Sequence, residues 1–129
     1  MSTSILIVEN ELDIADIIRR YLEFEGFTAT CVISCEDARV ACAARLPDVI
    51  VLDWRLPGIS GDEWVDELRA HPQTADIPIV MMTGGYPTPR LQAHMAAAEI
   101  PILIKPFSLD QLVEYIERVS TRQRIIGAD

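Results

Sequence analysis

The sequence lacks any apolar run near the roughly 18 residues that a membrane-spanning helix needs. The apolar stretch Ser4–Val8 has no basic flank and is followed at once by acidic residues, so it does not resemble a secretory signal. These two absences predict a soluble, cytoplasmic protein without a membrane partner.

Positive charge is also scarce, because 11 Lys and Arg stand against 20 Asp and Glu, giving a formal net charge of −9. Binding to nucleic acid phosphates depends on an excess of basic residues, so direct nucleic acid binding is disfavoured. Basic protein surfaces and cations are the favoured partners.

Cysteine is rare and its spacing is uninformative. Cys31, Cys35 and Cys42 form an odd set with no C-x-x-C pair and no nearby histidine. This pattern argues against a zinc site or a disulfide framework. We expect the three residues to be small, reduced members of the core.

What the chain does contain is an alternation of short apolar runs and amphipathic segments, over 129 residues that suit one domain. Strands are predicted at 4–8, 28–33, 49–52, 77–82 and 102–104. The run 28–33 is the least uniformly apolar and is predicted to lie at an edge. Right-handed crossovers fold five such βα units into a helix-covered parallel sheet. We expect the domain to span 1–120, with a polar tail over 121–129.

The helices are predicted from apolar periodicity and from capping residues. Ile14, Ile17, Ile18 and Tyr21 recur at i, i+3, i+4 and i+7 and are predicted to form the core face of the first helix. Later helix starts are predicted at three capping residues, namely Ser34, Thr88 before Pro89, and Ser108 with Gln111 as a capping box.

Polar side chains stand at the carboxyl ends of four predicted strands: Glu9 with Asn10, then Asp53, Thr83 and Lys105. In open α/β sheets the ligand crevice lies outside these strand ends, so one crevice collects the set. Two carboxylates and an amide oxygen suit Mg²⁺. A carboxylate can also become an aspartyl phosphate, with a lysine and a hydroxyl stabilising the phosphoryl oxygens; Asp53, Lys105 and Thr83 fit these roles.

These motifs resemble the receiver domain of the two-component response regulator family, from Ile5 to about Val119. The matching pieces are 5–11, 53–61 with Pro57, Thr83-Gly84 and 105–107. The resemblance implies a flavodoxin-like, doubly wound sheet of five parallel strands in the order 2-1-3-4-5, with five helices. It also implies a phosphoryl-accepting switch, not an enzyme with a separate substrate, that slowly hydrolyses its own aspartyl phosphate.

By this resemblance, Asp53 accepts a phosphoryl group from a histidine kinase or a histidine phosphotransfer protein and alters a face that binds a downstream protein. Mg²⁺ would be held by Glu9, Asn10, Asp53 and the backbone carbonyl of Arg55.

Thr83 and Lys105 would sense the phosphoryl oxygens. Arg55 and Gly85 lie where the family tunes the rate of dephosphorylation.

Two residues depart from the family pattern. Asn10 replaces the second acid of a usual acidic pair, so we predict weaker Mg²⁺ binding; Asn10 could equally cap the first helix. Ile102 stands where the family commonly has a switch aromatic. Either Tyr86 supplies a substitute ring, or the signal leaves through the loop and helix that follow Thr83.

Other functions remain open at this stage. A stand-alone receiver is the leading interpretation, and a fragment of a longer protein and a dimer are alternatives to it. A pseudo-receiver, which binds partners without phosphorylation, is the alternative favoured by Asn10 and Ile102. A haloacid dehalogenase phosphatase would need a second acid where Arg55 stands, and a flavodoxin would need a phosphate loop in place of 9–11.

Overall fold

The fold was analysed in a computed structural model, which describes residues 2–127. Five strands alternate with five helices along the chain. The strands are β1 (Ser4–Val8), β2 (Thr28–Val32), β3 (Val49–Asp53), β4 (Ile79–Thr83) and β5 (Ile102–Ile104). The helices are α1 (Leu12–Phe24), α2 (Cys35–Ala44), α3 (Gly61–Ala70), α4 (Pro89–Ala97) and α5 (Leu109–Gly127).

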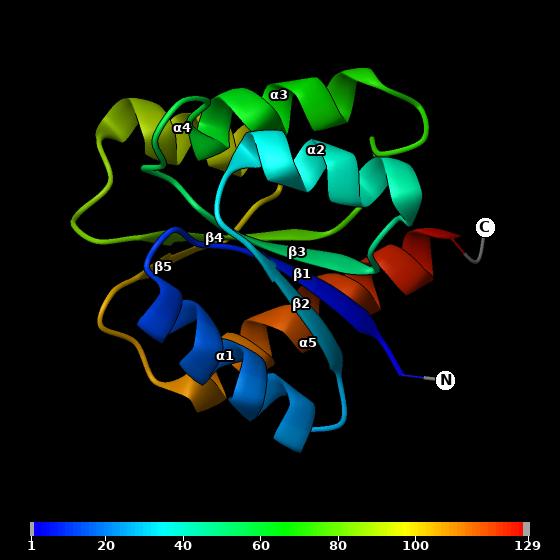
Figure 1. The fold of residues 1–129 in the computed structure, drawn as a ribbon. Coiled ribbons are helices and arrows are strands. Elements are labelled where there is room, and N and C mark those ends of the chain that lie inside the picture. The colour runs from blue at the N-terminus through cyan, green and yellow to red at the C-terminus, as the bar shows by residue number, and fades with distance from the viewer. Residues whose placement is uncertain (1, 128–129) are drawn as a thin grey trace.

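The strands form one parallel sheet in the order β2-β1-β3-β4-β5, which confirms the predicted fold and the edge position of β2. Helices α2, α3 and α4 cover one face, and α1 and α5 cover the other (Figure 1). The central strand β3 is buried along its whole length, because helices cover both of its faces. Within residues 2–127, no helix combines the length and apolarity needed to cross a membrane.

Each face of the sheet has its own hydrophobic core. Leu6, Ile50 and Trp64 belong to the core under α2, α3 and α4, whereas Ile7, Val51 and Leu112 belong to the core under α1 and α5. The cysteines have free thiols, and Cys35 and Cys42 are buried, as expected from the sequence.

The predicted core face of α1 is confirmed at Ile18, which is buried, and at Ile14, which packs against the core, but it is wrong at Ile17. Ala15, Ile18 and Leu22 are buried, whereas Ile17 is 57% exposed. The N-cap of this helix is Glu11 and not Asn10, and no side chain caps it. The cap hydroxyls predicted at Ser34, Thr88 and Ser108 are confirmed, because each accepts a backbone N–H three residues later. The return bond from the Gln111 side chain, which would complete a capping box, stays a prediction.

The strand ends at Val32, Asp53 and Thr83 each differ by one residue from those predicted, and two boundaries differ by more. Strand β4 begins at Ile79, because Ile77 donates to Thr74 in a turn and Pro78 has no N–H to give to the sheet. Helix α5 continues to Gly127, where a tail from residue 121 was predicted; no proline or glycine interrupts it before its last residue. Residues 128–129 of that tail lie outside the described residues.

Helix α3 is tied to its neighbours through two consecutive acids. Arg39 on α2 makes a two-pronged ion pair with Glu67, with Nε–Oε2 2.8 Å and Nη2–Oε1 2.5 Å. Nε2 of His94 on α4 lies 2.6 Å from Oδ1 of Asp66. His94 thus bridges two helices near the surface.

Candidate functional site

A cleft of about 470 Å³ lies at the carboxyl ends of the strands, where the sequence placed the site. Asn10, Asp53, Thr83 and Lys105 all line it, together with the Trp54-Arg55 and 84–86 loops. Because parallel strands end on one edge of the sheet, residues that are far apart in the sequence meet here.

Glu9, Asp53 and Lys105 form a buried charge cluster under the cleft. Lys105 Nζ donates to Glu9 Oε1 at 2.6 Å and to Asp53 Oδ2 at 3.5 Å. The second Glu9 oxygen accepts the backbone N–H of Glu11 at 3.2 Å. Glu9 is completely buried, while Asp53 is 6% exposed. Asp53 lines the cleft directly and is the more accessible of the two carboxylates, with Glu9 beneath it.

Two carboxylates with one lysine leave this cluster with excess negative charge. Burial and the nearby charge of Glu9 raise the pKa of Asp53 to about 7, against the opposing effect of Lys105. Burial acts to lower the pKa of Lys105, but its bonds to Glu9 and Asp53 outweigh burial and raise it. Lys105 thus stays protonated, and a further cation would stabilise the ionised Asp53.

The donor chemistry fits Mg²⁺, which binds one or two carboxylates, keeps several waters and prefers oxygen ligands. Asn10 is exposed at the rim of the cleft and adds an amide oxygen. Within residues 2–127, no three His, Cys, Asp or Glu side chains are grouped to hold a metal.

The turn after Asp53 is packed too tightly for any side chain larger than glycine at position 61. The Gly61 N–H donates to the Trp54 carbonyl at 2.7 Å, and a Cβ on Gly61 would lie 2.4 Å from the Asp53 carbonyl oxygen. The Trp54 indole N–H donates to Asp62 at 3.1 Å, and the Arg55 guanidinium stacks 4.4 Å above the Trp54 ring. The segment carrying Asp53 is therefore fixed to the start of α3.

Thr83 lies across the cleft from this turn and is held by the loop that follows it. Its hydroxyl donates to the Gly85 carbonyl at 3.0 Å, and the side chain is buried. The Lys105 N–H donates to the Thr83 carbonyl at 2.7 Å, and the Lys105-Pro106 peptide is cis. The backbone of β4 thereby positions Lys105 at the cleft.

The two candidate switch residues lie in different surroundings. Tyr86 is 90% exposed at the mouth of the cleft. Ile102 is half-buried, pairs with Met81 of β4 and packs on the core that contains Leu91 and Met95 of α4. The aliphatic side chain at 102 is thus part of the packing beneath α4.

Residues 5–117 match the family model described as the response regulator receiver domain. The chain belongs to this family. As a receiver domain it is 34% identical over 125 residues to the phosphate regulon transcriptional regulatory protein PhoB of Rhizobium meliloti, a match covering 96% of this chain and 55% of that protein. The PhoB protein of Pseudomonas aeruginosa is 36% identical over 120 residues, covering 92% and 52%. The receiver thus spans about half the length of these curated relatives.

Solved structures show the same fold. NtrX from Brucella abortus matches with a TM-score of 0.89 and 26% identity, over 99% of this receiver and 29% of that chain. Chemotaxis protein CheY4 from Vibrio cholerae matches with a TM-score of 0.84, over 92% and 99% of the two chains, and at 24% identity it supports the fold alone. The family and the fold predicted from the sequence are confirmed, whereas the roles assigned to individual residues stay predictions.

Proposed function

We propose that this receiver domain accepts a phosphoryl group on Asp53 from a histidine kinase or a histidine phosphotransfer protein in the cytoplasm. The proposal is carried by the position of Asp53, which ends the central strand, lines the cleft and has the Lys105 ammonium 3.5 Å away. A new bond from a carboxylate oxygen to phosphorus would form as the donor's nitrogen–phosphorus bond breaks.

The residues around Asp53 have separate tasks. Lys105 balances charge on the phosphoryl oxygens, and the tight turn at Gly61 keeps the attacking carboxylate in place. Glu9, Asn10, Asp53 and the Arg55 carbonyl would hold Mg²⁺, which when bound neutralises phosphoryl oxygens. No separate substrate is converted, so we do not class the protein as an enzyme, apart from slow hydrolysis of its own aspartyl phosphate.

The outgoing signal is proposed to run through the loop between β4 and α4. If the Thr83 hydroxyl turns to a phosphoryl oxygen, it leaves the Gly85 carbonyl and frees the loop that leads to the Thr88 cap of α4. The exposed position of Tyr86 and the aliphatic Ile102 favour this route over an aromatic rearrangement. The changed surface would bind a downstream protein, with Arg55 and Gly85 tuning the lifetime of the phosphoryl group.

The competing proposal is a pseudo-receiver that binds a partner without phosphorylation. It is favoured by the close Lys105–Glu9 pair at 2.6 Å, which already occupies the lysine, and by Asn10 at the rim. Retained Asp53, Thr83 and Lys105 favour the phosphorylated switch instead.

Intact mass after incubation with acetyl phosphate, with and without Mg²⁺, separates the two proposals. A gain of one phosphoryl group that requires Mg²⁺ and is lost in Asp53→Asn supports the switch. The matched control is Asp13→Asn, which changes an exposed acid in the first turn of α1 and should leave the gain intact. No gain, even with a purified histidine kinase as donor, would favour the pseudo-receiver.

A further inference from the structure

A second cleft, of about 520 Å³, lies at the opposite end of the sheet from Asp53. Its floor is a corner of the sheet formed by two cross-strand pairs, Ser4 with Thr28 and Leu6 with Thr30. Thr28 and Thr30 are exposed because α2 ends at Ala44 and leaves this corner of β2 uncovered. The cleft therefore belongs to neither the Asp53 site nor the loop after Thr83.

The wall of this cleft is made by the end of α2 and the turn that follows. Ala41, Leu46 and Pro47 supply apolar surface, and Leu46 is 45% exposed. The lining is mainly apolar, with a small number of hydroxyl groups, and its volume falls in the range of small-molecule sites. Ser2 and Thr28 already share a hydrogen bond at the open side.

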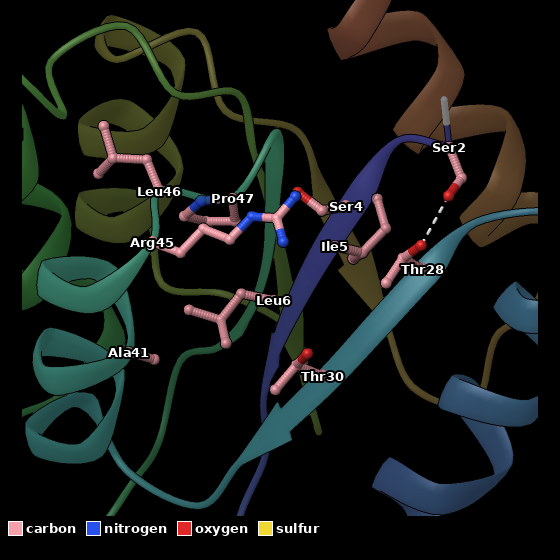
Figure 2. Close-up of a pocket in the computed structure, with 10 residues that line it drawn as sticks. All are labelled: Ser2, Ser4, Ile5, Leu6, Thr28, Thr30, Ala41, Arg45, Leu46 and Pro47. Carbon is pink, nitrogen blue, oxygen red and sulfur yellow. Dashed lines mark hydrogen bonds between the residues drawn. The ribbon is translucent and has the colours of Figure 1, made fainter.

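Arg45 is the basic group of the cleft. Figure 2 shows its side chain extending from the end of α2 across the opening, with the guanidinium directed toward Ser4. None of the ion pairs among the side chains that the structure describes, those of residues 2–121, involves Arg45. The nearby acid is Asp48, whose carboxylate accepts both the N–H and the hydroxyl of Ser4 at 2.8 and 3.1 Å. Asp48 is thus engaged with Ser4, and Arg45 presents a planar double donor to the cleft.

We propose that this cleft binds a small organic anion, a monocarboxylate with an apolar body. The carboxylate lies on Arg45, which can donate two parallel hydrogen bonds to it. The apolar body covers Leu6, Ala41 and Leu46. Because the whole chain carries a net charge of −9, long-range attraction does not assist an anion here, and binding depends on Arg45 together with apolar contact.

The test uses octanoate as the probe. The control ligand is octylammonium, which has a similar alkyl chain and the opposite charge. In ¹⁵N–¹H spectra of the full chain, octanoate should shift the amides of Ser4, Thr30, Ala41 and Leu46 in a saturable way, with a Kd of about 1 mM or lower. Octylammonium should bind at least about tenfold more weakly, because Arg45 repels it.

Variants decide which group holds the probe. Arg45→Gln should weaken octanoate binding at least about tenfold. The matched control is Arg90→Gln, at an exposed arginine on α4, which should leave octanoate binding unchanged. Ala41→Phe should block the probe by filling the wall, and Arg45→Gln keeps the test valid if that variant fails to fold. Equal binding of the two probes, or equal octanoate affinity in Arg45→Gln, would overturn the proposal. The proposal would also be overturned if the amide signals of β2 broadened with protein concentration and not with probe concentration. Such broadening would show that a second copy of the chain pairs with this edge of the sheet.

Discussion

Neutralising Asp53 should stabilise the metal-free protein, and the gain should grow with pH. The pKa of Asp53 is about 7 in the folded chain, because of burial and the neighbouring Glu9, against a usual value of 3.8. Since the folded-state pKa is the higher one, ionisation favours the unfolded chain. The carboxyl therefore does not destabilise the folded chain below about pH 4. The free energy of unfolding then falls as the pH rises from about 4 to about 7.

The size of the effect follows from that difference. Going from 3.8 to about 7 corresponds to at most about 4 kcal/mol of destabilisation above pH 7, and to about 2 kcal/mol at pH 5. Asp53→Asn removes the charge and keeps the shape of the side chain. We therefore expect its free energy of unfolding to exceed that of the wild type by about 2 kcal/mol more at pH 8 than at pH 5.

Urea unfolding in the presence of a chelator, followed by circular dichroism at several pH values, measures this difference. Asp13→Asn, at an exposed acid, controls for the change in net charge. A difference between Asp53→Asn and the wild type that does not change from pH 5 to pH 8 would refute the reasoning. It would mean that Lys105 alone neutralises both Glu9 and Asp53.

Three further outcomes are expected. Asn10→Asp should tighten Mg²⁺ binding about tenfold or more by adding a carboxylate at the rim, as read from Trp54 fluorescence beside Asp53; equal affinities would count against the predicted role of Asn10. Gly61→Ala should lower the free energy of unfolding by about 1–3 kcal/mol, because its Cβ would meet the Asp53 carbonyl, while Gly84→Ala, with open space around it, serves as the control in the same urea experiment. Ile18→Ala should lower the free energy of unfolding by about 2–4 kcal/mol and Ile17→Ala by under about 0.5 kcal/mol, as measured by thermal or urea unfolding. Similar losses in the two variants would contradict the observed core face of α1.

The meeting of Asp53, Thr83 and Lys105 at one cleft could be predicted because these residues follow strands with strong sequence signals. An apolar run that ends on Asp53 and breaks at Pro57 and Gly58 indicates a strand and a turn, and parallel strands bring their ends together. Thr83 and Lys105 were found by the same reasoning. The pairing of Lys105 with a fully buried Glu9 was not predicted, because the reach of one long side chain toward another depends on packing that periodicity does not describe.

Ile17 was wrongly predicted to lie on the core face of α1 for a related reason. Ile17 adds strongly to an apolar pattern and Ala15 adds little, yet the structure buries Ala15 because close packing on the sheet favours a small residue there. The His94–Asp66 bridge joins two helices that are separated in sequence, and no local motif marks it. The cleft beside Arg45 arises because α2 stops short of the sheet corner, which is a property of helix length and placement.

Helix α3 is joined both to its two neighbouring helices and to the turn that carries Asp53. The two-pronged Arg39–Glu67 pair joins α2 to α3, and the Trp54 indole joins the turn after Asp53 to α3 through Asp62. Helix α4 is joined to α3 by the His94–Asp66 bond and by Leu91 and Met95, which are buried in the same core as Trp64 of α3. A displacement of the Asp53 turn would therefore reach α3 first, through Trp54 and Asp62, and any movement of α4 against α3 would cost core contacts as well as one side-chain bond.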